Sequence, residues 1–315
     1  MSLFITTFES VAVLLGIGVL GFWIISRRIL PGDILGFLSP LALDIALPCL
    51  IFANIVQNFS PGDSPGWWQL PLWCFFFIAV AGALTFLAAF IAARDIRSEF
   101  AVSLFYQNAI FFPLMIIAGM YGDESPYLVF LFLFTIFYPA FFFSTYHFFF
   151  ENKGVRKLDW KKIFHPVLIV TVGAIVIRLA GVQDFIPGFI ISILSMVGNM
   201  TIPLIMLILG GNIYLDFQKK GRVRVAEMIK FVAIKNIVFP LVFLGIVLLI
   251  RPSYPVALLI LLESAIPPIT AVPLVTERCG GNRAVVDQFL LASFLFSLIS
   301  VSVMVSLFSM FFSPP

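Results

Sequence analysis

Long apolar stretches separated by short polar segments follow one another along the whole chain. Each stretch has about the 20 apolar residues that an α-helix needs to cross a bilayer, so the pattern predicts ten transmembrane helices. The predicted spans are 6–26, 35–57, 68–93, 98–120, 126–150, 163–182, 187–214, 226–249, 254–275 and 285–311. The predicted fold class is therefore an all-α integral membrane protein.

Basic residues gather in alternate segments between these spans. Of the 19 lysines and arginines, most follow the first, third, fifth, seventh or ninth span, whereas only Arg178 and Arg251 lie in the even-numbered loops. Positively charged loops stay in the cytoplasm. We therefore expect cytoplasmic odd-numbered loops and extracytoplasmic termini, in a cell membrane (inner or plasma membrane).

Prolines interrupt two of the predicted spans. The fourth span contains Gln107–Pro113 and the ninth contains Glu263–Pro273. A helix broken within the bilayer survives only inside protein or beside a wet cavity, because the freed backbone groups need partners. A pair of such breaks, one in each half, is the best sequence signal for a transporter's binding site. The substrate-binding residues predicted on this basis are Asn108, Pro113, Ser264, Pro267, Pro268 and Thr270.

The chain divides into two halves of five spans each. The most basic segment, 151–162, forms a linker between residues 1–150 and residues 163–315. Because five is an odd number, the second half must insert upside down relative to the first. We predict two inverted five-helix repeats, whose broken fourth and ninth spans cross each other.

Two further polar residues support this repeat. Asp44 lies four residues before Pro48 in the second span, and Asn199 lies four residues before Pro203 in the seventh. By the pseudo-symmetry of the halves, Asp44 and Asn199 should face each other. They would either contact the substrate or hold neighbouring helices together.

Composition restricts the class of function. Hydrophobic residues make up 61% of the 315 residues and charged residues only 11%, against about 25% charged residues in a soluble domain. The three cysteines and two histidines fit no metal or disulfide spacing. The chain lacks HExxH and GxxxxGK[ST] motifs, which disfavours a membrane enzyme and an ATP-driven pump. We expect no organic cofactor and no nucleic-acid partner.

These residues together resemble the auxin efflux carrier family. The likeness covers nearly the whole chain and depends on the order of five short matches: Pro48, Asn108 with Pro113, Ile266–Pro268, Cys279–Asn282 and Ala292–Leu298. The bile acid:sodium symporters look like more distant relatives with the same fold. In place of the small residues that the family often has before the span-four proline, this chain has Phe111 and Phe112, which narrow or reshape the site.

The resemblance implies an architecture and a mechanism. Spans one, two, six and seven would form a scaffold, often dimeric, so a homodimer is expected through it. Spans three to five and eight to ten would form a transport domain that shifts like an elevator. Bacterial members are associated with small organic acids such as malate and malonate, and plant members with auxin.

Glu263 is the main candidate for ion coupling, because an acid within a membrane span is costly and is functional by default. In the sodium symporters a similar acid contributes to sodium binding, which implies Glu263, Gln107 and Asn108 as oxygen ligands of a bound Na⁺. Alternatively, Glu263 carries a proton, or it is a structural acid paired with Lys235. Lys235 lies near the middle of the eighth span, where it could instead attract the substrate's carboxylate.

The function predicted from these observations is secondary active transport of a small organic anion, coupled to Na⁺ or H⁺, in the lipid bilayer. If Na⁺ is the coupling ion, a bound Na⁺ would be present, and we expect no other cofactor. The alternative is a membrane receptor or sensor that uses the transporter fold without transport.

Overall fold

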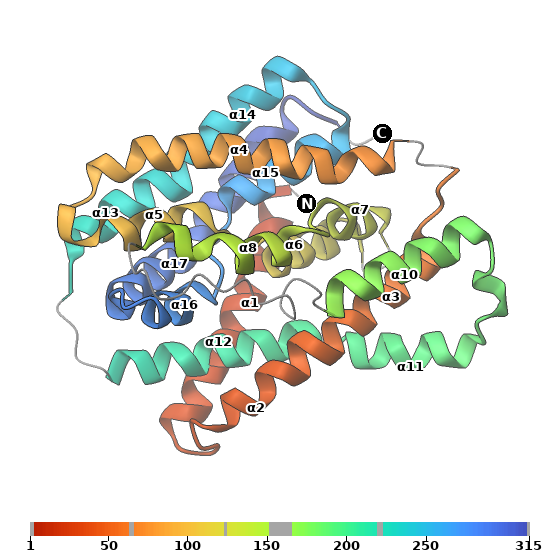
Figure 1. Ribbon diagram of the computed structural model, residues 1–315, viewed down its shortest axis with the longest axis horizontal. Coiled ribbons are helices and arrows are strands. Elements are labelled where there is room, and N and C mark those ends of the chain that lie inside the picture. The colour runs from red at the N-terminus through yellow and green to blue at the C-terminus, as the bar shows by residue number, and fades with distance from the viewer. Residues whose placement is uncertain (1–2, 63–65, 123–124, 151–165, 219–222, 314–315) are drawn as a thin grey trace.

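Helices form the architecture of this protein (Figure 1), and the parts of the chain that the structure describes contain no strand. The computed structural model describes residues 3–62, 66–122, 125–150, 166–218 and 223–313. The predicted linker 151–162 and the start of the predicted sixth span lie outside the described residues. The helical class predicted from the apolar pattern is therefore confirmed.

The first half of the chain contains one uninterrupted long helix followed by several that bend or break. Its helices are α1 (Leu3–Ser26), α2 (Ile34–Pro40), η1 (Leu41–Ala46), α3 (Leu47–Asn58), η2 (Trp67–Gln69), α4 (Leu70–Ala88), η3 (Ala89–Ile91), η4 (Arg94–Ile96), α5 (Arg97–Phe105), α6 (Phe111–Tyr121), α7 (Pro126–Phe134), α8 (Tyr138–Thr145) and η5 (Tyr146–Phe149).

The second half begins with short helices and ends with the longest one. Its helices are α10 (Pro166–Ala180), η6 (Gln183–Phe185), α11 (Gly188–Gly198), α12 (Thr201–Gln218), α13 (Val225–Ala233), η7 (Ile234–Val238), α14 (Phe239–Ile250), α15 (Tyr254–Ala265), α16 (Val272–Arg278) and α17 (Arg283–Ser309).

Within the described residues, seven helical stretches are long and apolar enough to cross a membrane. They are Phe4–Ser26, Ile34–Asn58, Trp67–Ile91, Pro126–Phe149, Gly188–Leu215, Val225–Ile250 and Arg283–Ser309. Three shorter apolar helices, Phe111–Tyr121, Pro166–Ala180 and Tyr254–Ala265, overlap parts of the predicted fourth, sixth and ninth spans. Seven stretches of the described chain are thus candidate spans by length and composition, and ten spans remain a prediction.

Helices α1 and α12 approach so closely that their backbones touch. A Cβ atom added to Gly210 would lie 1.7 Å from the carbonyl oxygen of Gly18, and one added to Gly21 would lie 2.2 Å from that of Leu207. Small residues permit this kind of close approach in membrane proteins. The glycines on these two helices therefore fix their spacing.

Prolines explain two wide turns that carry polar side chains. The π-helical turn η1 precedes Pro48 and contains Asp44, and the π-helical turn η7 precedes Pro240 and contains Lys235. Proline lacks the backbone N–H that would bond to the preceding turn, and π-turns inside helices are frequent at functional sites. The chain therefore has a π-helical turn at each of two charged residues in the apolar spans, Asp44 and Lys235.

Candidate functional site

The two breaks lie directly against each other at the centre of the candidate site. Tyr106–Asn108, after α5, runs antiparallel to Pro267–Ile269, after α15. The backbone N–H of Asn108 donates to the carbonyl oxygen of Pro267 at 2.9 Å, and the N–H of Ile269 donates to that of Tyr106 at 3.0 Å. Two extended segments from distant parts of the chain thus satisfy each other's backbone, as broken membrane helices require.

Tyr138, at the start of α8, satisfies the backbone of Gln107. Its hydroxyl accepts a hydrogen bond from the Gln107 N–H and donates one to the Gln107 carbonyl oxygen, each at 3.0 Å. Both residues are buried. Sequence reasoning missed this tyrosine, because nothing in the pattern of the fifth span points to a segment 31 residues away.

The prolines lie in two different places relative to the breaks. Pro267 and Pro268 are part of the extended segment itself, whereas Pro113 and Pro273 lie in the first turns of α6 and α16. A first-turn proline costs little, because its missing N–H has no partner within the helix. The predicted break in the fourth span is therefore present, and Pro113 lies in the first turn of the helix that follows it.

A group of unsatisfied polar atoms lies beside this crossing. Both carboxyl oxygens of Glu263, both amide atoms of Asn108 and the amide oxygen of Gln107 are buried without a hydrogen bond of ordinary geometry, although the Gln107 side chain lies near enough to Glu263 to interact with it. Glu263 and Asn108 are each only 1% exposed. Burying polar groups without partners is costly. In a native protein such a group calls for an explanation, for example a ligand, an ion or water that completes the bonding.

Ser264 differs from these neighbours, although it precedes the same break. Its hydroxyl donates to the carbonyl oxygen of Leu261, one turn earlier in α15, at 2.7 Å. The side chain is therefore satisfied within its own helix.

Lys235 lies buried near the acid but makes no ion pair with it. Its Nζ donates a long hydrogen bond, 3.4 Å, to the carbonyl oxygen of Leu104 in the last turn of α5, and it lies 5.3 Å from the centre of the Phe239 ring. It is close enough to Glu263 for their charges to interact. The cation and the acid thus share one buried region.

A cavity of about 930 Å³ lies beside the crossing, between α2 and α12 on one side and α16 and α17 on the other. Its lining is mainly apolar, with polar side chains that include Ser39, Asn212, Thr270 and Gln288. Phe111, at the start of α6, lines it too. Most lining positions come from helices that are far apart in the sequence, which is why the sequence did not reveal this cavity.

Of the predicted substrate residues, Thr270 lines this cavity. The other five are buried beside the crossing: Asn108, Pro113, Ser264, Pro267 and Pro268. Among the residues predicted to couple an ion, Glu263, Gln107, Asn108 and Lys235 are all buried in the same region. The structure therefore brings the predicted residues together, mostly one layer behind the cavity wall.

Asp44 and Asn199 lie elsewhere. Asp44, in η1, and Asn199, directly after α11, are exposed, and neither lines the cavity. Their predicted role as polar residues of the scaffold stays a prediction.

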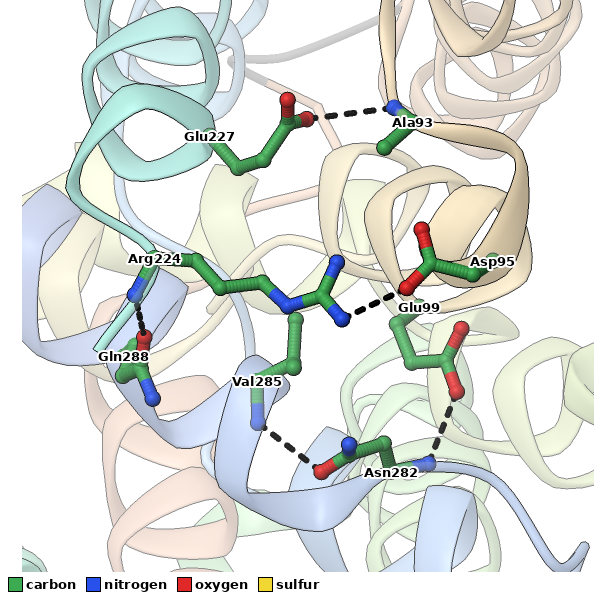
Figure 2. A network of polar contacts seen from close by, with 8 residues as sticks. All are labelled: Ala93, Asp95, Glu99, Arg224, Glu227, Asn282, Val285 and Gln288. Carbon is green, nitrogen blue, oxygen red and sulfur yellow. Dashed lines mark hydrogen bonds and ion pairs between the residues drawn. The ribbon is translucent and has the colours of Figure 1, made fainter. Parts of the chain in front are cut away.

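Polar contacts tie together three segments, which Figure 2 shows from close by. Arg224 donates to the Asp95 carboxylate at 2.5 Å through its guanidinium, and through its backbone N–H to Gln288 Oε1 at 2.9 Å. The guanidinium thereby lowers the pKa of Asp95 from its usual value. Glu227 Oε2 accepts from the Ala93 N–H at 3.2 Å. The loops after the predicted third and seventh spans therefore meet here.

The loop before α17 joins the same network. Glu99 Oε1 accepts a hydrogen bond from the backbone N–H of Asn282 at 2.7 Å, and the Asn282 side chain accepts one from the N–H of Val285 at 3.3 Å. Asn282 is thus the N-cap of α17, and the Glu99 carboxylate lies where the helix dipole favours a negative charge. This contact fixes the start of the last helix against α5.

A family model described as a membrane transport protein matches residues 6–158 and 153–305, which together cover nearly the whole chain. No curated protein matches the chain.

Proposed function

Because the chain belongs to the membrane transport protein family, which is the auxin efflux carrier family, we propose that it is a secondary active transporter of a small organic anion. Members of this family are transporters rather than enzymes. The observation that carries the proposal is the crossing of Tyr106–Asn108 and Pro267–Ile269 next to a large cavity. Paired broken helices are the binding-site signature of many secondary transporters.

The substrate's carboxylate would bind where α6 begins. Phe111, the first residue of α6, lines the cavity, and the unpaired N–H groups and positive dipole end of a helix N-terminus favour an anion. Asn108, directly before this helix, has donor and acceptor atoms that no protein group satisfies. With Thr270 in the wall, and with Pro113, Ser264, Pro267 and Pro268 shaping the breaks, these residues form the proposed substrate site.

The coupling site would lie around Glu263. Its two carboxyl oxygens, with the amide oxygens of Gln107 and Asn108, are four buried acceptors without hydrogen bonds, and hard cations such as Na⁺ prefer oxygen ligands of this kind. Protonation of Glu263 would instead give its carboxyl group an O–H donor for these buried acceptors. We propose coupling to Na⁺ or to H⁺, with Lys235 as the balancing charge.

Transport would occur by an elevator-type movement between two inverted repeats, residues 1–150 and 163–315, joined by 151–162. The close backbone contact of α1 with α12 supports a rigid scaffold, formed by the predicted spans one, two, six and seven. The polar network in Figure 2 supports a second unit, since it links α5, α13 and α17.

The same network would lie on the cytoplasmic side, with both termini outside the cell. Loops after the predicted third, seventh and ninth spans meet in it, and they contain arginines such as Arg94, Arg224 and Arg283. Arginine-rich loops remain in the cytoplasm. A homodimer would form through the scaffold.

The experiment that tests the function is uptake by purified protein in liposomes. Malate, malonate and indole-3-acetate serve as labelled probes, with an inward gradient of Na⁺, of H⁺ or of neither. Accumulation of one acid that depends on an ion gradient supports the transporter and identifies the coupling ion. Binding of these acids without any uptake would favour the receptor or sensor instead.

A further inference from the structure

The cavity contains a single basic side chain among its described lining residues. That residue is Arg283, and the only other charged residues in the described lining are Asp33 and Asp287. An anion that enters the cavity therefore meets a mainly apolar wall, two acids and one guanidinium. Because like charges repel and opposite charges attract, Arg283 is where an anionic group can bind.

The position of Arg283 is fixed by the structure around it. It is the first residue of α17 and directly follows the N-cap Asn282. The backbone N–H of Asn282 donates a hydrogen bond to the Glu99 carboxylate (Figure 2). Other lining residues from segments between helices, Gly32 and Val223, accompany it. Arg283 thus lines the same cavity as Phe111 and Thr270, which are close in the sequence to the two crossing segments.

Acidic residues hold the guanidinium in exchangeable contacts. Arg283 Nη1 lies 2.7 Å from Glu277 Oε2, and its Nε lies 3.5 Å from Asp287 Oδ2, which is longer than a charge-assisted hydrogen bond. The Glu277 side chain is 54% exposed. The Arg283 side chain is 23% exposed, so the pair is open to solvent mainly on the Glu277 side, and ion pairs in contact with solvent contribute little net stability. Replacing the Glu277 carboxylate with another carboxylate therefore costs the protein little.

We propose that Arg283 is the residue that first receives the substrate's carboxylate, by exchanging it for Glu277. The planar guanidinium presents two parallel donors that match a carboxylate. Glu277 then acts as a competitor that occupies the arginine when the cavity contains no substrate. This inference rests on the proposed function, since it requires an anionic substrate.

The test compares four variants in liposomes, with whichever of malate, malonate and indole-3-acetate the parent transports. Arg283→Gln should raise KM about tenfold, as expected for a lost charged hydrogen bond, with a smaller change in kcat. Glu277→Gln should lower KM roughly twofold to fivefold, because it removes the competing carboxylate of an exposed pair. Arg283→Lys should fall between Arg283→Gln and the parent.

Arg278→Gln is the matched control. Arg278 is an exposed arginine in the last turn of α16, five positions before Arg283, and it does not line the cavity. Its variant should keep the parental KM. The opposite signs expected for Arg283→Gln and Glu277→Gln separate ligand binding from a structural role, because breaking a structural ion pair from either side has the same effect.

The proposal is overturned if the parent transports an acid and Arg283→Gln keeps its KM, or if both ion-pair variants raise KM equally. A lower unfolding temperature would reveal that Arg283→Gln is misfolded. In that case the KM of Arg283→Lys is compared with the KM of the parent instead. If the parent neither transports nor is stabilised by any of the three acids, the proposed function itself fails, and this inference fails with it.

Discussion

The hydroxyl group of Tyr138 bonds to both backbone groups of Gln107, accepting from its N–H and donating to its carbonyl oxygen at 3.0 Å each. One side chain thus replaces the two helical hydrogen bonds that Gln107 loses at the break. Because Gln107 is only 2% exposed, water has little access to its backbone.

Tyr138→Phe should therefore lower the unfolding free energy by about 1–3 kcal/mol, the range for leaving buried polar groups unsatisfied. Thermal unfolding in detergent measures the change. Tyr106→Phe is the control, since the Tyr106 hydroxyl bonds only to Thr145 Oγ1, which also donates to the carbonyl oxygen of Phe141. Equal losses in the two variants would show that Tyr138 has no special role at the break.

Asn108→Ala should keep the parental stability but lose substrate affinity. The buried amide of Asn108 makes no hydrogen bond with protein groups, so removing it leaves no partner unsatisfied, whereas a bound ligand loses a contact. We expect affinity for the transported acid to fall about tenfold, as for a lost hydrogen bond to a charged group. Scintillation proximity binding with the labelled acid measures it.

Asn236→Ala provides the opposite control for Asn108. Asn236 is also buried, but its amide bonds to the backbone and hydroxyl of Ser293 and to the hydroxyl of Ser300. This variant should lose stability rather than affinity. Parental affinity in Asn108→Ala would remove Asn108 from the substrate site.

Sodium should raise the unfolding temperature of the parent but not that of Glu263→Gln, if Na⁺ is the coupling ion. A ligand that binds only the folded state adds RT ln(1 + [L]/Kd) to stability, about 2.7 kcal/mol at 100 times Kd. The measurement replaces Na⁺ with choline at constant pH and ionic strength.

Ser264→Ala is the control for the sodium experiment, because the Ser264 hydroxyl bonds within its own helix. It should respond to Na⁺ as the parent does. If Na⁺ stabilises neither the parent nor either variant, the sodium site is absent and proton coupling gains support.

Gly210→Ala should destabilise the protein strongly. The added Cβ would lie 1.7 Å from the carbonyl oxygen of Gly18, so α1 and α12 must separate, and overpacking of this kind costs about 1–3 kcal/mol or more. Gly16→Ala, on α1 with nothing within 4 Å of its added Cβ, should be neutral. The yield of folded protein after size-exclusion chromatography distinguishes the two, and equal yields would contradict the close contact.

Apolar length and proline positions were enough to predict where most helices lie and where two of them break. The signal is strong because both properties act locally: a span must be long enough for the bilayer, and a proline changes its own turn. The sequence alone does not show whether such a proline lies within the extended segment, like Pro267, or in the first turn of the helix after it, like Pro113.

The parts of the site that the sequence did not predict are formed by segments that are far apart in the chain. Tyr138 was missed because only the folded chain brings it to Gln107. The sequence places Arg283 after the predicted ninth span and Asn212 near the end of the seventh, but it does not indicate that both line one cavity. Charge and apolar patterning place a residue along the membrane normal but leave open which helix it faces.

Helices α1 and α12 meet through bare backbone, and this determines how they respond to the membrane. Where side chains separate two helices, new rotamers can absorb a change in angle or distance. No such adjustment exists at Gly18 and Gly210, where nothing lies between the main chains. A thicker or thinner bilayer must therefore tilt these two helices together as one rigid unit. Lipid composition then changes their tilt without changing the distance between them.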